Sequence, residues 1–402
     1  MKTTLHVRHL NLASALVLAL SAAACGPRAS TAQAPTASSA APTPAPAAQP
    51  SAQVKPEPTP EEKKKAEEAA KLAEDQKKMR EAAQAELARW TPELRAEATK
   101  LATTQYPSLK AALNAALKSN VRKPGNADRD KHRHPLATLE FAGIKPNSTV
   151  IELSPGEGWY TELLAPTLAA KGQLIVNSTD PNGPADARPT YYAERLQRFL
   201  DKSPELFGKV QRVIHSFEKP ELGIDAKADV VLAFRTFHGW HNGKATQAWL
   251  TEVYDALKPG GVFAIEEHRA KADANPDESS KLGYLPEAFV ISQVEAAGFK
   301  LLAKSEVNAN PKDTKDYADG VWTLPPTLRL GDKDRQKYLD IGESDRMTLK
   351  FQKIAQKPAP KVAAPAAAAP AAVPPAPAAP AAAAPAAPAA AVPPAPAPKK
   401  TP

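Results

Sequence analysis

The 402-residue chain has a single cysteine, Cys25, and only 18 glycines. One cysteine excludes an intramolecular disulfide framework and any metal site built from several cysteines. Glycine falls below its usual share, while the 42 prolines reach about twice theirs. The prolines cluster at the two ends, so the part that folds is shorter than the chain. Aromatic residues at 6% and charged residues at 24% are still compatible with one sizeable buried core.

The chain also lacks a broad basic face, although its formal net charge is +8. Four positive charges belong to a C-terminal tail without acidic side chains: Lys357, Lys361, Lys399 and Lys400. Another three come from residues 122–135, where five basic residues face two aspartates. The remainder is near neutral, which argues against nucleic acid as a partner.

The N-terminal residues 1–24 have the form of a signal peptide. A basic start with Lys2 and Arg8 precedes an apolar stretch over residues 10–24, which is too short to span a bilayer comfortably. The chain is therefore expected to be exported.

The end of this segment, Ala22-Ala23-Ala24-Cys25, resembles a bacterial lipobox, although Ala22 stands where a leucine is usual. In a lipobox, cleavage precedes a cysteine that is then lipidated. The resemblance implies a membrane anchor at Cys25. With Gly26 following, it also implies an outer-membrane lipoprotein that faces the periplasm. An ordinary signal peptide cut after Ala-x-Ala is the alternative.

Low-complexity segments flank the part that folds. Residues 25–60, after the signal peptide, are rich in Ala, Pro, Ser and Thr and predict a semi-rigid linker. Residues 355–402 are almost wholly Ala and Pro, which predicts a disordered tail with local polyproline II geometry. Such a tail is either a reaching or cell-wall contact segment or an inert extension.

Residues 61–120 predict a charged helix followed by capping helices. The stretch 61–89 is alanine-rich, has no Pro or Gly, and carries Glu–Lys pairs four residues apart. Its apolar residues are too sparse for a coiled-coil seam, so we expect a solvated stalk rather than a partner-binding helix. The stretch 90–117 predicts one or two amphipathic helices that cap the following domain.

Between residues 121 and 354, short apolar runs alternate with helical stretches. We expect strands at 149–153, 174–176, 210–214, 229–234, 261–266, 299–306 and 346–352. We expect helices at 159–170, 191–200, 247–257 and 286–297. Continuous apolar strands between helices predict an α/β fold whose mostly parallel sheet has helices on both faces. The ligand crevice of such a sheet lies beyond the carboxyl ends of its strands.

The first expected strand runs into a glycine turn, Glu152-Leu-Ser-Pro-Gly-Glu-Gly158. Its glycines allow the backbone to approach a ligand, and the helix that follows offers free N–H groups. The turn fails as a dinucleotide fingerprint because Thr161 stands at the third glycine position. It resembles motif I of the class I S-adenosylmethionine-dependent methyltransferases. The turn Lys258-Pro-Gly-Gly261, about 105 residues after Glu152, is a second feature of that superfamily.

Further segments resemble a bacterial family known mainly as predicted, frequently exported methyltransferases. They are Arg129-Asp-Lys-His-Arg-His-Pro135, Glu267-His-Arg269, Asn308-Ala-Asn-Pro-Lys-Asp-Thr-Lys-Asp-Tyr317, Val321-Trp-Thr-Leu-Pro-Pro326 and Ile341-Gly-Glu-Ser-Asp-Arg-Met347. The resemblance covers roughly residues 122–353. It implies a Rossmann-like class I methyltransferase sheet with an N-terminal helical extension, and S-adenosylmethionine as the cofactor. It does not imply a substrate.

The resemblance also implies cofactor contacts around the glycine turn. Gly156 and Gly158 let the backbone pass under the methionine part, while Glu152 orders the loop and the amino group. The other candidates in this segment are Ser154, Pro155, Trp159 and Tyr160. The two aromatic residues either line an apolar pocket or are plain packing.

The ribose position departs from the family pattern. An acid usually ends the second strand, but Asn177-Ser178 stands there, with Asp180 two residues late. Asp180 is our ribose candidate, and a simple loop aspartate is the alternative. Ser216 or Glu218, after the third strand, are candidates for adenine contact.

Methyl transfer is a displacement at a sulfonium carbon, so it needs alignment above all, and a base only when the acceptor must lose a proton. Candidates for that base are His238, Glu267 and His268, each of which has a structural hydrogen bond as its alternative role. Candidates for substrate binding are Arg235, Trp240, Arg269, Asn308 and Asn310. The alternative role is surface or interdomain ion pairing for the two arginines and plain packing for Trp240. For the two asparagines it is a place in a turn-rich loop. We expect no metal, because the histidines lack a zincin-like spacing.

Export of the protein conflicts with the use of a cofactor that is made in the cytoplasm. Two hypotheses about the function follow from this conflict. The first is an exported methyltransferase that acts on a small-molecule or envelope substrate. The second is a non-catalytic envelope lipoprotein that uses the same fold to bind another ligand or partner. A pocket that is intact for the methionine part of the cofactor would favour the first hypothesis over the second.

Overall fold

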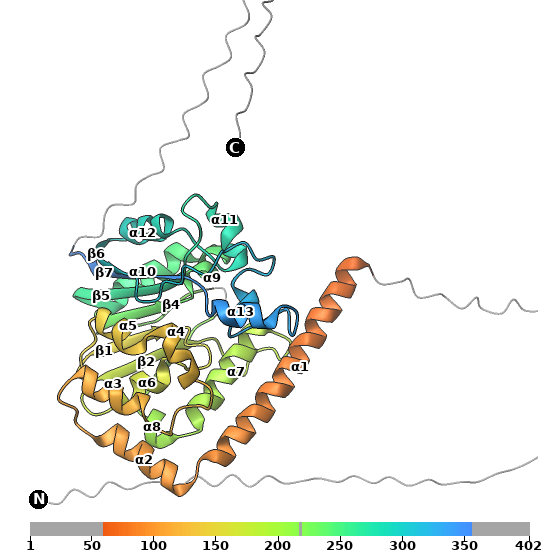
Figure 1. The fold of residues 1–402 in the computed structure, drawn as a ribbon. Coiled ribbons are helices and arrows are strands. Elements are labelled where there is room, and N and C mark those ends of the chain that lie inside the picture. The colour runs from red at the N-terminus through yellow and green to blue at the C-terminus, as the bar shows by residue number, and fades with distance from the viewer. Residues whose placement is uncertain (1–58, 217–218, 356–402) are drawn as a thin grey trace, which may run out of the picture. The chain divides into compact units, whose positions relative to one another are not determined.

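The computed structural model describes residues 59–216 and 219–355 (Figure 1). The expected signal peptide, Cys25, most of the linker, Glu218 and nearly all of the Ala/Pro tail lie outside the described residues. Within the described ranges, no helix has both the length and the hydropathy needed to cross a membrane.

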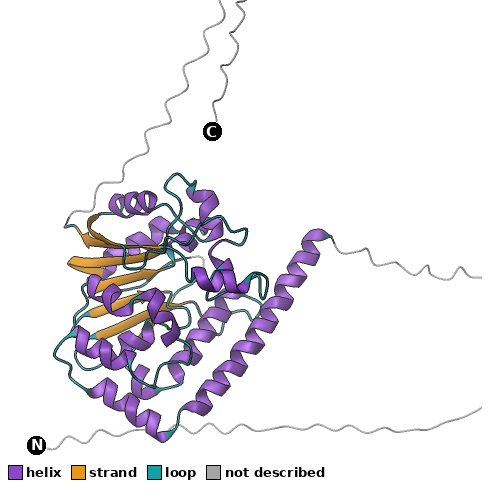
Figure 2. Cartoon of the chain, viewed as in Figure 1, coloured by secondary structure: helices purple, strands orange, loops and turns teal. Residues whose placement is uncertain are grey.

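A seven-stranded sheet forms the centre of the described part of the chain (Figure 2). Its strands are β1 (Thr149–Leu153), β2 (Gln173–Ser178), β3 (Gln211–Ile214), β4 (Ala228–Phe234), β5 (Leu257–His268), β6 (Phe299–Ser305) and β7 (Arg346–Lys353). The order across the sheet is β3-β2-β1-β4-β5-β7-β6. Only β7 runs antiparallel to its neighbours, β5 and β6. This is the Rossmann-like class I methyltransferase sheet, so the predicted fold is confirmed.

Helices cover both faces of this sheet (Figure 2). They are α1 (Pro60–Arg89), α2 (Pro92–Thr103), α3 (Leu109–Leu117), α4 (Asp130–Arg133), α5 (Pro135–Phe141), α6 (Thr161–Leu168), α7 (Arg188–Asp201), α8 (Pro204–Phe207), α9 (Phe237–Asn242), α10 (Thr246–Ala256), α11 (Pro276–Ser279), α12 (Glu287–Ala296) and α13 (Arg335–Ile341). The four helices expected in the core are α6, α7, α10 and α12. The sequence patterns did not predict α9, which begins three residues after β4 ends.

The central strands β1, β2 and β4 are buried from both sides, which explains their continuous apolar runs. In β4, Val230 and Leu232 belong to one hydrophobic cluster, with residues of α2, α3 and α6. Val231 and Ala233, whose side chains point to the opposite face, belong to a second cluster with residues of α10 and α12. Successive side chains of a strand alternate between faces, so an apolar residue is needed at every position.

The helix α1 is docked on the domain, so the expected solvated stalk is wrong. It starts at a capping box in which Thr59 and Glu62 exchange hydrogen bonds. Figure 1 shows α1 running beside α7, where Leu72 and Met79 form a small buried cluster with Tyr191. Two apolar residues seven apart are too few for a coiled coil, but they suffice for one-sided docking on a neighbouring helix.

Candidate functional site

The carboxyl end of β1 carries a buried acid, Glu152. Its Oε2 accepts a hydrogen bond from Thr161 Oγ at 2.7 Å, where α6 begins. Burial raises the pKa of Glu152 to about 7, although the Thr161 hydrogen bond and the charge of Arg235 lower it. The carboxyl is therefore poised between its charged and neutral forms near neutral pH.

The two glycines of the turn after β1 are required for different reasons. Both have positive φ, +62° at Gly156 and +75° at Gly158. A Cβ added at Gly156 would meet nothing within 4 Å, whereas one at Gly158 would lie 2.3 Å from Cε1 of Phe199. Gly156 thus borders open space that a ligand can approach, while Gly158 makes room for a ring of α7. The expected cofactor role fits Gly156 better than Gly158.

The end of β2 offers buried donors in place of the usual ribose acid. Asn177 Oδ1 accepts the backbone N–H of Ser154 at 2.6 Å. Asn177 Nδ2 and Ser178 Oγ are buried and have no hydrogen-bond partner among the described residues. Asp180 is exposed, and its Oδ1 accepts the backbone N–H of Asn182 at 2.8 Å, which is the geometry of a loop aspartate. The sequence had marked this position only as a departure from the family pattern.

The aromatic residues of the turn are buried and anchor the start of α6. Trp159 Nε1 donates to the carbonyl of Asn126 at 3.0 Å. Tyr160 donates through its hydroxyl to Glu266 Oε2 at 2.8 Å. Pro155, between them and β1, accepts the backbone N–H of Gly158 at 3.0 Å. Packing accounts for both rings, and neither lines an open pocket.

The three candidate bases meet where β4 and β5 end. Nδ1 of His238 lies 2.9 Å from Oε1 of Glu267, which is fully buried. The rings of His238 and His268 have centroids 5.7 Å apart. Burial, and then the charges of His238, Arg235 and Arg346, hold the pKa of His268 well below its ordinary value. His268 is therefore a neutral imidazole, with its Nδ1 in contact with Ser344 Oγ.

Arg235 follows β4 and faces the same region. It has φ of +59°, and its backbone N–H donates to the carbonyl of Glu266 at 2.6 Å. Its half-buried guanidinium has no hydrogen bond or ion pair among the residues that the structure describes. Its charge still lowers the pKa of Glu152 and of His268.

Arg269 does not fit the predicted substrate role. All five of its N–H donors are used by Glu287, Glu306 and Asp345. These hydrogen bonds hold its pKa above its ordinary value, although burial lowers it. The residue joins the end of β5 to the first residue of α12, to the residue after β6 and to the residue before β7.

The other three predicted substrate contacts are also structural. Trp240 is stacked on Trp249 with centroids 5.5 Å apart, inside the second hydrophobic cluster. Asn308 donates from Nδ2 to two threonine hydroxyls, those of Thr138 and Thr348. Asn310 donates to the carbonyls of Ile341 and Glu343. The dense polar loop that these asparagines occupy ties chain segments together instead of forming a rim.

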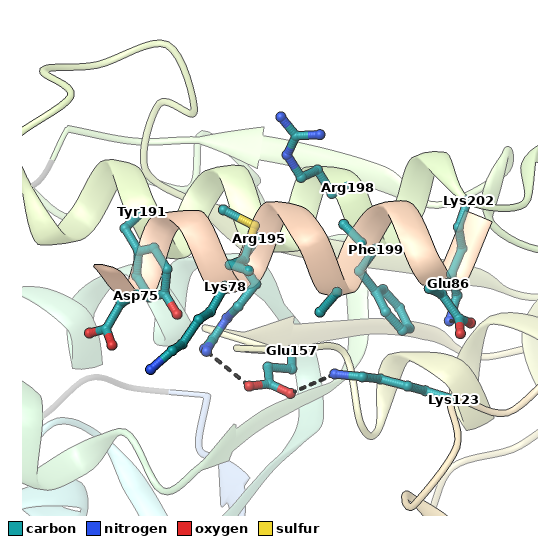
Figure 3. Close-up of a pocket in the computed structure, with 13 residues that line it drawn as sticks. Asp75, Lys78, Glu86, Lys123, Glu157, Tyr191, Arg195, Arg198, Phe199 and Lys202 are labelled. Atoms are coloured by element: carbon teal, nitrogen blue, oxygen red, sulfur yellow. Dashed lines mark hydrogen bonds and ion pairs between the residues drawn. The ribbon is translucent and has the colours of Figure 1, made fainter. Parts of the chain in front are cut away.

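A groove of about 260 Å³ lies between α1 and α7, next to the glycine turn (Figure 3). Glu157 of that turn pairs with Arg195 at 2.9 Å and with Lys123 at 3.0 Å. These charges hold the pKa of Glu157 below its ordinary value although burial raises it. Ser216, the expected adenine contact, lies apart from this groove and accepts the backbone N–H of Lys219 at 3.0 Å.

No family model and no curated protein matches the sequence. Among solved structures, an S-adenosylmethionine-dependent methyltransferase from Aquifex aeolicus is 17% identical, with the match covering 58% of this chain and 94% of that one at a TM-score of 0.38. N-methyltransferase NodS from Bradyrhizobium japonicum is 14% identical, covering 57% and 98% at 0.36. The 1,6-didemethyltoxoflavin-N1-methyltransferase of Burkholderia thailandensis is 15% identical, covering 56% and 78% at 0.34.

These similarities are too distant to carry a substrate or a residue role across. The strand order with its antiparallel β7 defines the class, a Rossmann-like class I methyltransferase fold. The function has to be inferred from the residues at the carboxyl ends of β1, β2, β4 and β5.

Proposed function

We propose that the protein is an S-adenosylmethionine-dependent methyltransferase whose acceptor is bound beside His238. One observation carries the proposal. The open approach at Gly156 lies at the carboxyl ends of β1 and β2, where Asn177 Nδ2 and Ser178 Oγ are buried without a hydrogen-bond partner among the described residues. Buried polar groups in native structures usually have partners, so these two fit the ribose hydroxyls of a bound cofactor.

The chain's own residues fit the cofactor as follows. Asn177 and Ser178 would hold the ribose, and the backbone at Gly156 would lie beside the methionine part. Glu152 would order the loop, as the family pattern implies. When bound, S-adenosylmethionine supplies an electrophilic methyl group on its sulfonium. The protein's contribution is then to align the acceptor and exclude water.

The pair formed by His238 and Glu267 is suited to take a proton from the acceptor. The carboxylate is buried and accepts from Nδ1, so the Nδ1–H tautomer of the ring is favoured. That tautomer leaves Nε2 as a lone-pair acceptor for a proton. A carboxylate that orients a histidine in this way also stabilises the imidazolium once it forms.

The experiment is calorimetric titration of the full chain with S-adenosylmethionine and its demethylated product, S-adenosylhomocysteine. The matched variants are Gly156→Ala and Gly223→Ala, because both glycines have similar φ, +62° and +61°, and both Cβ positions are open. We expect micromolar binding that Gly156→Ala abolishes and Gly223→Ala preserves. No binding by a folded chain would contradict the proposal, as would equal effects of the two variants.

We also propose that the enzyme is exported, that it is lipidated at Cys25, and that it acts on a small-molecule or envelope substrate. The support is the sequence of residues 1–25 alone. Growth with a labelled fatty acid should mark the protein, and Cys25→Ser should abolish the label while export continues. Persistence of the label in the Cys25→Ser variant would contradict lipidation at this residue.

A further inference from the structure

Four arginines converge where β4, β5 and β7 lie next to α4 and the short 3₁₀ helix Ala127–Arg129 that precedes it. They are Arg129, Arg133, Arg235 and Arg346. The charges of the first, third and fourth all affect the pKa of Arg133. The carboxylates that form ion pairs with this group are Glu266 and Glu343. Glu152 and Glu157 act on Arg235 and Arg129 only through their charge, without an ion pair.

Three of the arginines already share the two carboxylates. Glu343 pairs with Arg129 at 2.7 Å, Arg133 at 3.1 Å and Arg346 at 2.7 Å. Glu266 pairs with Arg346 at 2.7 Å. The arginine charges outweigh burial and hold the pKa of Glu343 far below its ordinary value. No further acceptor among the described residues binds Arg235.

Several donors of the cluster have no acceptor within residues 59–216 and 219–355. Arg129 Nη2 and Arg133 Nη1 are buried without a hydrogen-bond partner among the described residues. Arg133 is only 3% exposed and lies over the Trp159 ring, 4.7 Å from its centroid. Arg235 adds a whole guanidinium without a partner in the described part of the chain. Buried donors such as those of Arg129 and Arg133 are rarely left unpaired, and the more exposed guanidinium of Arg235 leaves a charge beside them that a ligand can reach. This arrangement points to an anion that completes it.

The position of Arg235 links the cluster to the candidate base. It lies three residues before His238, in the short connection between β4 and α9. Its backbone is in the left-handed region, which is strained for a side chain other than glycine or asparagine. Such strain is concentrated at binding and catalytic sites.

The electrostatics agree with the geometry. Burial lowers the pKa of Arg133 well below its ordinary value, and the charge of Arg235 lowers it further. The pKa of Arg129 is lowered too, by burial and by the charge of Arg235, although Glu343 raises it. A ligand with negative oxygens at this point would relieve the repulsion among the three.

We propose that Arg129, Arg133 and Arg235 bind a carboxylate or phosphate group of the methyl acceptor and so place the acceptor beside His238. This rests on the proposed function for the identity of the ligand as an acceptor. Guanidinium forks match the oxygens of both groups. The carboxylate of the cofactor's methionine part has the same chemistry, so the test has to separate the two sources.

The test titrates the full chain with inorganic phosphate in an uncharged buffer, with and without saturating S-adenosylhomocysteine. Arg235→Gln removes the charge of a side chain that forms no ion pair with any residue the structure describes, so we expect the fold to be retained. We expect it to weaken phosphate binding about tenfold or more and to leave S-adenosylhomocysteine affinity within about twofold. Arg235→Lys should retain part of the phosphate affinity. The matched control is Arg95→Gln, which removes a partly exposed arginine paired with Glu205, away from the cluster.

Two results would overturn the inference. One is the absence of phosphate binding by the full chain, or unchanged binding in Arg235→Gln. The other is an equal loss of S-adenosylhomocysteine affinity in Arg235→Gln while 5′-methylthioadenosine, which lacks the amino acid, binds as before. That result would assign the arginines to the cofactor carboxylate. Phosphate binding through Arg235 in a chain that does not bind S-adenosylhomocysteine would contradict the proposed function and leave the anion site standing.

Discussion

Nδ1 of His238 lies 2.9 Å from Oε1 of Glu267, while Oε2 of Glu267 accepts the backbone N–H groups of Phe237 and His238 at 2.6 and 3.2 Å. One buried carboxylate thus orients the imidazole ring and holds the first turn of α9. The same contacts explain why a six-residue helix forms at a β4 exit that carries no side-chain N-cap of its own.

The tautomer of His238 can be tested directly. Glu267→Gln can keep its oxygen for the backbone N–H groups of Phe237 and His238. Its amide nitrogen then faces the imidazole and displaces the hydrogen bond that Oε1 accepts from the His268 N–H, so Nδ1 has to become the acceptor. We expect ¹⁵N-labelled protein to show the Nδ1–H tautomer in the original chain and the Nε2–H tautomer in Glu267→Gln. Methyl transfer to an acceptor that must lose a proton should fall by about 10²–10⁴-fold.

The control for this experiment is His241, whose Nε2 lies 2.8 Å from Asp277 Oδ1. Its tautomer should be the same in both proteins, because it does not contact Glu267. Identical His238 spectra in the two proteins would show that the carboxylate does not set the ring's protonation.

Replacing Gly156 and replacing Gly158 with alanine should lower the free energy of unfolding by different amounts. Gly158→Ala places a Cβ against Phe199 in a left-handed backbone, and we expect it to lower the free energy of unfolding by about 2–4 kcal/mol. Gly156→Ala has the backbone strain without the clash, so its cost should be about 1 kcal/mol. Urea unfolding of both variants measures the difference. Equal costs would mean that the turn relaxes away from Phe199.

This pair of glycines shows how far sequence reasoning reaches. The apolar runs and glycine turns predicted all seven described strands. The local signal is continuous in β1, β2 and β4, which are buried on both faces, whereas β3 and β6 are partly exposed. The distinct roles of Gly156 and Gly158 depend on Phe199, which is distant in sequence and next to the turn only in the folded chain. Local patterns also could not show that Glu343 gathers Arg129 and Arg133 from more than 200 residues away.

Glu152 should make stability depend on pH. Its pKa is about 7 in the folded chain against an ordinary value of 4.5, so the folded state holds a proton that the unfolded state has lost between these values. Stability contributed by the neutral carboxyl is therefore lost as pH rises through that window, by about 3 kcal/mol in total.

The variant Glu152→Gln should lack this loss. Its free energy of unfolding, relative to the original chain, should rise by about 3 kcal/mol between pH 4.5 and pH 8. Urea unfolding across this range gives the difference, in which the titration of other carboxylates cancels. Parallel curves for the two proteins would contradict a raised pKa at this residue.

The docking of α1 on the domain can be tested by amide hydrogen exchange. Besides the contacts of Leu72 and Met79 with Tyr191, Gln76 Nε2 donates to the carbonyl of Ala185 at 2.6 Å, in the loop that connects β2 to α7. Because α1 follows the expected linker, this contact joins the linker side of the chain to the region proposed for the ribose.

Leu72→Ala should speed amide hydrogen exchange in α1 and in residues 179–187 by about tenfold, with exchange in β4 and β5 unchanged. Leu87→Ala, at a residue that is 40% exposed on the same helix, is the matched control and should change neither. Faster exchange confined to α1 would show that the helix docks without holding the loop, and unchanged exchange everywhere would show that the apolar cluster does not stabilise the docking.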